Sequence, residues 1–224
     1  MLPLNDVVSR TENEISSKSI STNPKEKKTK QKLQLKAPTQ ERSKQTVNTL
    51  IQSCTDLLRK EGFFGVTTDK VAKSAGISIG SLYQFFGNKE SVVSAVIQHA
   101  LEGDMQLFEN KIKEFSLSQE TNKKTYVIKT LIEIFENDLE LKTKMLPIQN
   151  YLLEPTWINQ YVQFFVKNIS TFLSTENEQI SEVKINIFVS SFLGLIQNLI
   201  QQNKKLSDEK DYLNYVIGLY SQFI

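Results

Sequence analysis

The 224-residue chain contains one cysteine, one histidine and one tryptophan. A single thiol cannot form a disulfide within the chain, which excludes a small secreted scaffold held together by disulfides and fits a reducing compartment. The first ten residues, MLPLNDVVSR, lack the basic segment followed by an apolar segment that a signal peptide requires. We therefore expect a cytoplasmic protein, long enough to bury a substantial core.

The sequence also lacks the groups from which an enzyme builds its site. It has no glycine-rich phosphate loop after a strand and no cluster of metal ligands, besides having only one His and one Cys. We predict no catalytic residue, no cofactor and no metal. One acidic stretch could in principle hold a metal, but a solvated helix face explains it more simply; it consists of Glu133, Glu136, Asp138 and Glu140.

The formal net charge of +2 hides an uneven distribution along the chain. Residues 1–100 carry 15 basic and 9 acidic side chains, a balance of +6, whereas residues 101–224 carry 12 and 16, a balance of −4. The net charge is small because the positive balance of the first half and the negative balance of the second half nearly cancel. The basic front half is the candidate for binding a polyanion such as nucleic acid.

Residues 1–38 are poor in aromatic side chains and rich in Ser, Thr, Asn and Lys, so we predict a disordered basic extension. The segment PKEKKTKQK at residues 24–32 holds five Lys against one Glu. Two interpretations stay open for it. It contacts the phosphate backbone of DNA without reading sequence, or it is a solvated tail.

Proline is absent from Thr39 to Leu146, while five of the eight glycines fall within residues 62–87. This pattern predicts long helices with one turn-dense insert. The helix before the insert carries an apolar stripe at helical spacing. Cys54 belongs to the stripe, so we interpret it as a core thiol; the stripe consists of Val47, Leu50, Ile51, Cys54, Leu57 and Leu58.

The turn-dense insert predicts two short helices. Gly62 ends the preceding helix at a position that needs positive φ, and Thr67 or Thr68 offers a hydroxyl that caps the next helix, at residues 69–75. That helix stops at Gly76. Ser78 then caps a second helix, whose inner side consists of Leu82, Phe85 and Phe86. Two short helices around a glycine turn make a helix-turn-helix, and the second is sized for the DNA major groove.

The string VTTDKVAKSAGISIGSLYQFFGNKESVVSAV, residues 66–96, resembles the DNA-binding signature of the tetracycline-repressor (TetR) family of bacterial regulators. The helix at residues 47–60 and the link EGFFGVTT also match, so the resemblance covers about residues 43–100. Its specificity lies in the ordered set Thr-Thr, Ala-Gly-Ile-Ser, Gly-Ser-Leu-Tyr, Phe and Asn-Lys-Glu at these spacings.

The resemblance implies a role for each matched position. Leu82 and Phe86 point inward, and Thr67 or Thr68 together with Lys89 bind phosphates on either side of the groove. Ile79 departs from the Lys or Pro that family members often carry there. The implied DNA-facing residues of the recognition helix are Ser78, Ile79, Gly80, Ser81, Tyr83 and Gln84.

Nineteen residues between Lys184 and Lys204 carry no charge, yet eight of them are Asn, Gln or Ser. At helical spacing the apolar residues fill one half of this segment, which predicts an amphipathic helix and not a membrane span. Its uncharged polar face needs a partner helix. The last helix is also uncharged after Asp211, and in the resembled family the last two long helices form the dimer interface; we predict a homodimer whose interface includes Gly194, Asn198 and Gly218.

Between these regions we expect helices at about 88–115, 122–141 and 155–175, with breaks at 116–121 and around Pro147 and Pro155. Aromatic residues are plentiful there. The resembled family encloses an effector pocket in this part of the chain, and an aromatic lining favours an apolar or planar ligand. An ordinary core is the alternative for each candidate, and the candidates are Phe135, Tyr151, Trp157, Tyr161 and Phe165.

The sequence thus predicts an all-α fold with three parts: a basic extension at 1–38, a helix-turn-helix DNA-binding domain at 39–88, and a helical effector-binding and dimerisation domain at 89–224. The predicted function is a sequence-specific transcriptional regulator that binds double-stranded operator DNA. We expect a repressor released from a palindromic operator by a small-molecule effector. The alternatives are an activator or a protein-controlled regulator of the same fold, and then a small helical enzyme.

Overall fold

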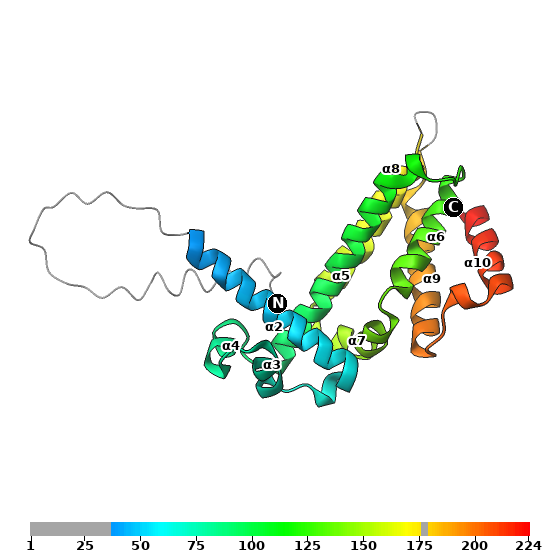
Figure 1. Cartoon of the computed structure of the whole chain (residues 1–224). Coiled ribbons are helices and arrows are strands. Elements are labelled where there is room, and N and C mark those ends of the chain that lie inside the picture. The colour runs from blue at the N-terminus through cyan, green and yellow to red at the C-terminus, as the bar shows by residue number, and fades with distance from the viewer. Residues whose placement is uncertain (1–36, 176–178) are drawn as a thin grey trace, which may run out of the picture. The chain divides into compact units, whose positions relative to one another are not determined.

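The structure is a computed structural model that describes residues 37–175 and 179–224. Over these ranges the backbone forms nine α-helices and two short 3-10 helices, with no strand (Figure 1). The predicted all-α fold is confirmed. The predicted extension at 1–38 lies almost wholly outside the described residues.

The chain divides into two compact units, one ending at Gln98 and one beginning at His99. The boundary falls within α5 (Lys89–Glu114), so this one helix contributes residues to both units.

The first unit contains α2 (Ala37–Gly65), α3 (Thr68–Ala75), α4 (Ile79–Phe85) and the beginning of α5. The predicted apolar stripe of α2 is buried except for Leu57, which is half-buried. α3 packs against both α2 and α4. Together these helices enclose a small core that includes Leu50, Leu58, Val71, Leu82, Phe86, Val93 and Ile97.

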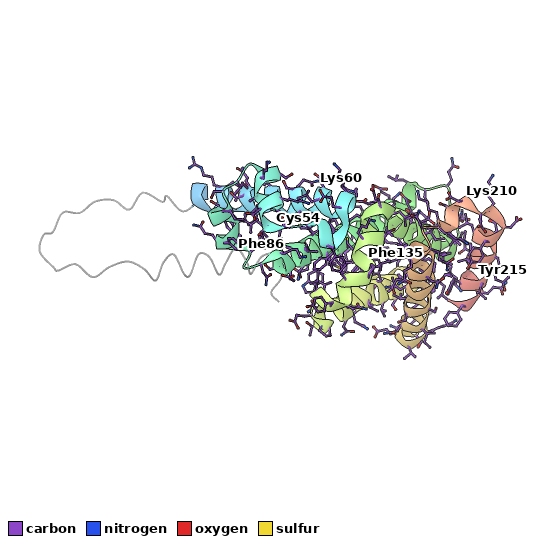
Figure 2. All side chains as sticks on the ribbon, turned by 90° about the horizontal axis from the view of Figure 1, so that it is seen from below. Cys54, Lys60, Phe86, Phe135, Lys210 and Tyr215 are labelled. Atoms are coloured by element: carbon purple, nitrogen blue, oxygen red, sulfur yellow. The ribbon has the colours of Figure 1, made fainter. Side chains whose placement is uncertain are left out.

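Cys54 lies fully buried within this core, and Figure 2 shows it and Phe86 among the helices of the first unit. Burial raises the pKa of the Cys54 thiol to about 12. The thiol is therefore protonated at neutral pH and packs as a small apolar side chain, as its place on the α2 stripe predicts.

The second unit contains the rest of α5 and five further helices: α6 (Lys123–Glu136), α7 (Leu139–Leu152), α8 (Pro155–Leu173), α9 (Glu182–Gln201) and α10 (Lys210–Phe223). α8 and α7 pack against α9, and α10 lies beside α6 (Figure 1). The short 3-10 helices Phe115–Leu117 and Leu206–Asp208 precede α6 and α10.

Aromatic rings from separate helices meet in the core of the second unit. The Phe165 ring lies 5.2 Å from that of Phe108 and 6.0 Å from that of Phe135, measured between centroids. Phe135 also lies 6.5 Å from Phe192. These contacts join α5, α6, α8 and α9 around one cluster, because a large ring reaches across the space between two helix axes.

The expected helix at 122–141 and the expected break at Pro147 are wrong. α6 ends at Glu136, Asp138 adopts a left-handed conformation with φ 51° and caps α7, and Pro147 lies inside α7. Pro147 is exposed, while Met145 and Gln149 of the same helix are buried. Burial of one face thus outweighs the hydrogen bond that proline removes from the helix.

α9 is the one described helix that is long and apolar enough, by length and composition, to cross a membrane. Eight of its side chains are buried against other helices of the second unit, among them Phe188, Phe192 and Ile196. The buried residues follow the spacing predicted from the sequence. α9 is therefore an amphipathic core helix in this structure.

Candidate DNA-binding surface and effector cavity

Two glycines shape the link between α2 and α3. Gly62 has φ 69° and ψ 177°, which interrupts the helix at the position where the sequence predicted its end. Gly65 is required for space, since an added Cβ would lie 2.5 Å from the Cβ of Glu61. The chain can therefore turn tightly into α3 only with glycine at these positions.

Thr67 caps α3, and this settles the choice left open between the two threonines. Its hydroxyl oxygen accepts a hydrogen bond from the Lys70 backbone N–H at 3.3 Å. At the other end Gly76 adopts a left-handed conformation with φ 66°, and its N–H donates to the carbonyl of Lys73. A capped start and a glycine stop explain why this helix has only eight residues.

Ser78 caps α4, as predicted, and its hydroxyl accepts a hydrogen bond from the Ser81 N–H at 3.1 Å. The side chains of Leu82 and Phe86 are buried, and Phe85 is half-buried. The opposite side of the helix is exposed, with Tyr83 52% exposed. The exposed residues are Ser78, Ile79, Gly80, Tyr83 and Gln84, while Ser81 is half-buried.

Thr68 and Tyr83 join the two short helices. Their hydroxyl oxygens lie 3.1 Å apart, and either can donate the hydrogen bond. The contact leaves each oxygen with capacity for a further partner. Two hydroxyl groups held side by side at the surface suit the oxygens of a DNA phosphate.

Lys89 is the first residue of α5, and its side chain folds over Phe63. The ammonium nitrogen lies 4.0 Å from the centroid of the Phe63 ring and donates to the Phe63 carbonyl at 3.4 Å. Sequence reasoning missed this role of Phe63. A phosphate bound at Lys89 would meet an ammonium whose position the aromatic ring already restricts.

Two further local contacts were missed in the sequence. Lys70 donates to a carboxylate oxygen of Glu61 at 2.5 Å and to the Gly65 carbonyl at 2.9 Å. Asn88 and Ser91 cap the start of α5 reciprocally, with the Ser91 N–H donating to the Asn88 side chain at 2.8 Å. The spacing Asn-x-x-Ser at a helix start is the signal that could have revealed the second.

The second unit contains a cavity of about 70 Å³ that opens to solvent. Fourteen residues of α5 to α9 line it, and most of them are apolar. Two of the five predicted effector residues, Phe135 and Tyr161, belong to the lining. The apolar part of the lining includes Leu101, Phe135, Met145, Ile158, Leu193 and Ile196.

The other three predicted effector residues lie elsewhere. Trp157 and Phe165 are buried in the core without lining this cavity, and Tyr151 is 81% exposed on the outer side of α7. The expectation for Tyr151 assumed that Pro147 ends a helix. Since α7 instead continues past Pro147, the side chain of Tyr151 turns to solvent.

A buried ion pair faces the cavity. Lys142 donates to a carboxylate oxygen of Asp104 at 2.9 Å, with the side chains only 10% and 6% exposed. The Tyr161 hydroxyl donates to the other oxygen of Asp104 at 3.1 Å, and Lys142 also donates to the Ile134 carbonyl at 2.5 Å. Burial raises the pKa of Asp104 and lowers that of Lys142, although the attraction between the two charges opposes both shifts.

Sequence reasoning did not find the Asp104–Lys142 pair. A signal for it was present, because Asp104 follows Leu101 by three residues and precedes Phe108 by four. That spacing places a carboxylate on a buried stripe, where it needs a partner. The partner itself, 38 residues away on α7, could not be read from the spacing.

The predicted dimer residues lie on exposed or half-buried parts of α9 and α10. Gly194 and Asn198 are exposed, Gly218 is half-buried, and a Cβ added at either glycine meets no atom within 4 Å. Apolar side chains on the same two helices are exposed as well. Figure 2 shows one of them, Tyr215, on α10. The most exposed are Val183, Ile187, Tyr215 and Leu219, of which Ile187 is 53% and Tyr215 68% exposed.

Across residues 37–175 and 179–224, no group of three or more His, Cys, Asp or Glu side chains could hold a metal ion. The acidic stretch considered in the sequence has other contacts. Glu133 forms an ion pair with Lys111 at 2.7 Å, and Glu136 accepts a hydrogen bond from the Ser207 N–H at 3.0 Å.

Comparison with known proteins agrees with the helix-turn-helix. Residues 50–96 match the family described as bacterial regulatory proteins, tetR family. The fatty acid metabolism regulator protein of Bacillus subtilis (strain 168) is 26% identical over 137 residues, which make up 60% of this chain and 69% of that protein.

Two solved structures show the same fold over most of their length. A regulator of the TetR family from Mesorhizobium loti has a TM-score of 0.64 at 15% identity, with 81% of this chain and 96% of that chain covered. The transcriptional regulator FadR from Bacillus subtilis, in complex with stearoyl-CoA, has a TM-score of 0.56 at 19% identity, with 79% and 98% covered. Over residues 50–96 the chain is thus similar to the DNA-binding part of tetR-family regulators, and its overall fold is that of solved regulators of this kind.

Proposed function

We propose that this regulator is a cytoplasmic homodimeric repressor that binds a near-palindromic operator and leaves it when an apolar small molecule occupies the cavity of the second unit. The observation that carries the proposal is the exposed side of α4, whose inner side is anchored by buried Leu82 and Phe86. Two such helices in a dimer would enter successive major grooves about 34 Å apart.

The proposed DNA contacts divide into two kinds. Tyr83, Thr67, Thr68 and Lys89 would bind phosphates and fix the position of the helix on the duplex. Base reading falls to the exposed positions of α4, where Gln84 can bond adenine bidentately and Ile79 can touch a thymine methyl. Gly80 has no side chain, which lets the helix backbone approach the groove; Ser78 and Ser81 can donate to phosphate or base edges.

The dimer is proposed from α9 and α10. Their exposed apolar side chains and small residues leave a surface that a second copy of the chain would cover. Gly194 and Gly218 would permit close helix crossings, and Asn198 would hydrogen-bond across the interface. Two helices from each subunit would form a four-helix bundle.

An acyl-chain compound is the proposed class of effector. The cavity is lined mostly by apolar residues, one relative is named as a fatty acid metabolism regulator, and one structural relative holds stearoyl-CoA. α5 contributes Lys89 to the DNA surface and Leu101 and Asp104 to the cavity lining. The effector would release DNA by its higher affinity for the form whose recognition helices are wrongly spaced.

The test begins by selecting operator DNA from a random pool with the full-length protein. Anisotropy titrations of the selected duplex then measure affinity, and octanoyl-CoA and palmitoyl-CoA are added to the complex. We expect an inverted repeat and release by one of the two compounds. Selection of no sequence would contradict the proposal, as would a complex that neither compound weakens.

An experiment in the cell distinguishes a repressor from an activator. Deleting the gene should raise the transcripts of genes beside a selected operator if the protein represses them. A fall in those transcripts would favour the activator alternative.

A further inference from the structure

Three of the five polar residues that line the cavity form one connected network, and the other two are Gln149 and Gln197. Asp104 of α5 accepts from Lys142 of α7 through one carboxylate oxygen and from Tyr161 of α8 through the other. All three residues line the cavity, and Phe135, which Figure 2 places among the helices of the second unit, lines it beside them. A ligand in the cavity can therefore contact this network, which holds the only charged groups of the cavity lining.

Lys142 retains one donor for a ligand. An ammonium group has three N–H bonds, and two of them are directed to the Asp104 carboxylate and the Ile134 carbonyl. The nitrogen also lies 5.5 Å from the centroid of the Phe135 ring. Since Lys142 and Phe135 both line the cavity, a ligand group that accepts a hydrogen bond can reach the third N–H there.

The Lys142–Asp104 pair carries no net charge, and a further negative charge acts on it. Lys142 contributes one positive charge and Asp104 one negative charge, both nearly excluded from water. A further carboxylate acts on both members of the pair, that of the exposed Asp138 at the start of α7, and it too is negative. A free carboxylate entering the cavity would add a negative charge beside a pair that is nearly excluded from water, with no further cation among the lining residues to balance it.

We propose that the Asp104–Lys142–Tyr161 network makes the cavity select a neutral acyl carbonyl, as in an ester or thioester, over the free fatty acid. The carbonyl oxygen accepts the third N–H of Lys142 and brings no charge. The chain of the ligand lies among the apolar residues. This inference rests on the proposed function in one respect, namely that the cavity is the effector site.

Direct binding to the full-length protein without DNA tests the selection. The probes are methyl octanoate and octanoyl-CoA on one side and sodium octanoate on the other, measured by titration calorimetry and by the fluorescence of Trp157, which is the one tryptophan and lies on α8. We expect the ester and the thioester to bind at least tenfold more tightly than octanoate. Octanoate binding as tightly as the ester, or no binding of any probe, would overturn the inference.

The two probes with an uncharged acyl carbonyl, one of them attached to the anionic coenzyme, separate the contribution of the carbonyl from that of the coenzyme. Binding of both methyl octanoate and octanoyl-CoA would show that the carbonyl and the acyl chain suffice for recognition. Binding of octanoyl-CoA alone, with methyl octanoate as weak as octanoate, overturns the assignment to this network because the coenzyme would then carry the recognition.

Two variants test the charge balance itself. Asp138→Asn keeps a residue that can cap α7 and adopt positive φ, so the fold is retained while one negative charge is lost. Octanoate should then bind about two- to threefold more tightly, with ester binding unchanged. Asp104→Asn leaves Lys142 without its carboxylate and should reverse the preference in favour of octanoate.

Val162→Ala is the matched control, since Val162 lines the cavity without a polar group. It should weaken ester and octanoate by the same factor and leave their ratio unchanged. A ratio that moves in this variant as far as in Asp138→Asn would contradict the role of charge.

The proposed function is tested separately, by adding the same probes to the complex with operator DNA and measuring release of the DNA. Selective ester binding that leaves DNA binding unchanged supports the inference and contradicts effector control through this cavity. Release of DNA by another compound, while no ester binds, contradicts the inference alone.

Discussion

The hydroxyl groups of Thr68 and Tyr83 lie 3.1 Å apart and connect the first helix of the helix-turn-helix to its recognition helix. Thr68 begins α3 and Tyr83 lies in the middle of α4, so the contact spans 15 residues of sequence. It holds the phenol ring at a fixed place on the surface although the side chain is 52% exposed. A DNA phosphate would then find two hydroxyl donors already in position.

Removing either hydroxyl should weaken operator binding without changing its salt dependence. We expect Tyr83→Phe and Thr68→Val each to lower affinity by about five- to tenfold, or about 1 kcal/mol. Because the two groups act together, the double variant should lose less than the product of the single losses. Anisotropy titrations with the selected operator at several salt concentrations measure both quantities. Full additivity in the double variant would show that the hydroxyl groups act independently.

Lys89 should contribute a charge-dependent contact. Lys89→Met keeps an apolar stem over the Phe63 ring but removes the ammonium, so affinity should fall and the slope of log affinity against log salt should shrink by about one. Phe63→Leu is the matched variant, since it keeps the charge and removes the ring that holds it. Its slope should equal that of the wild type. An unchanged slope in Lys89→Met would mean that no phosphate binds there.

A further prediction concerns the basic extension, which lies almost wholly outside the described residues. Residues 1–36 carry 8 basic and 4 acidic side chains, whereas residues 37–100 carry 7 and 5. Deleting residues 1–36 should preserve the selected operator sequence while lowering affinity and its salt slope, because sequence reading belongs to α4. If neither affinity nor slope changes, the extension is a solvated tail.

Gly194→Lys should separate the subunits while leaving each one folded. A Cβ at Gly194 meets no atom within 4 Å in a single chain, so the lysine has room unless a second copy covers the position. Gly103→Lys is the matched control, since Gly103 is also an exposed helix glycine with nothing within 4 Å. Light scattering should give a monomer for the first variant and a dimer for the second. A dimer of Gly194→Lys that still binds operator would exclude this face of α9.

Local chemistry allowed much of the DNA-binding unit to be predicted. Gly62, Gly76 and Ser78 act within a few residues of their own position, so sequence alone indicates the turn and the cap each one makes. The same reasoning failed at Pro147, where burial on the other face of α7 decides the structure. It also included Tyr151 among the effector candidates, although this side chain is 81% exposed, because spacing shows which residues share a face but not which neighbouring helix covers it.

The cavity was the least predictable part because its polar network is assembled from distant segments. Lys142 and Tyr161 lie 38 and 57 residues from Asp104, on three different helices. Aromatic content pointed to this part of the chain, and Phe135 and Tyr161 do line the cavity. No periodicity of a single helix could show that a carboxylate, an ammonium and a phenol meet there.

The buried network should lower the free energy of unfolding at neutral pH. It should lower it less at more acidic and at more basic pH. Asp104 has a raised pKa in the folded chain, so its contribution is fully present below the unfolded pKa of about 3.9 and is lost as pH rises through the folded value. Lys142 has a lowered pKa, so its contribution is present above about 10.4 and is lost as pH falls through the folded value. At a pH between the folded-state pKa values of Asp104 and Lys142, both stabilising contributions are lost.

An apolar replacement of the whole network makes this measurable. The triple variant Asp104→Leu, Lys142→Met and Tyr161→Phe leaves no polar side chain of the network without its partner, and it should be as stable as the wild type or more stable, by up to about 4 kcal/mol at pH 7. Its advantage should shrink as the pH falls toward the ordinary pKa of Asp, about 3.9, and as it rises toward that of Lys, about 10.4. Above about pH 10 the raised pKa of Tyr161 acts in the opposite direction, so the comparison ends below it.

Urea unfolding of the wild type and of the triple variant across this pH range gives the difference between their free energies of unfolding. The titration of all groups that the two proteins share cancels in this difference. Asp104→Leu alone is the control, because it leaves the Lys142 ammonium buried without its carboxylate and should lose about 3–5 kcal/mol at pH 7. A triple variant that is markedly less stable than the wild type at pH 7, or whose difference does not vary with pH, would show that the folded chain favours the charged pair. The buried charges would then stabilise the fold, and ligand selection would not be their main consequence.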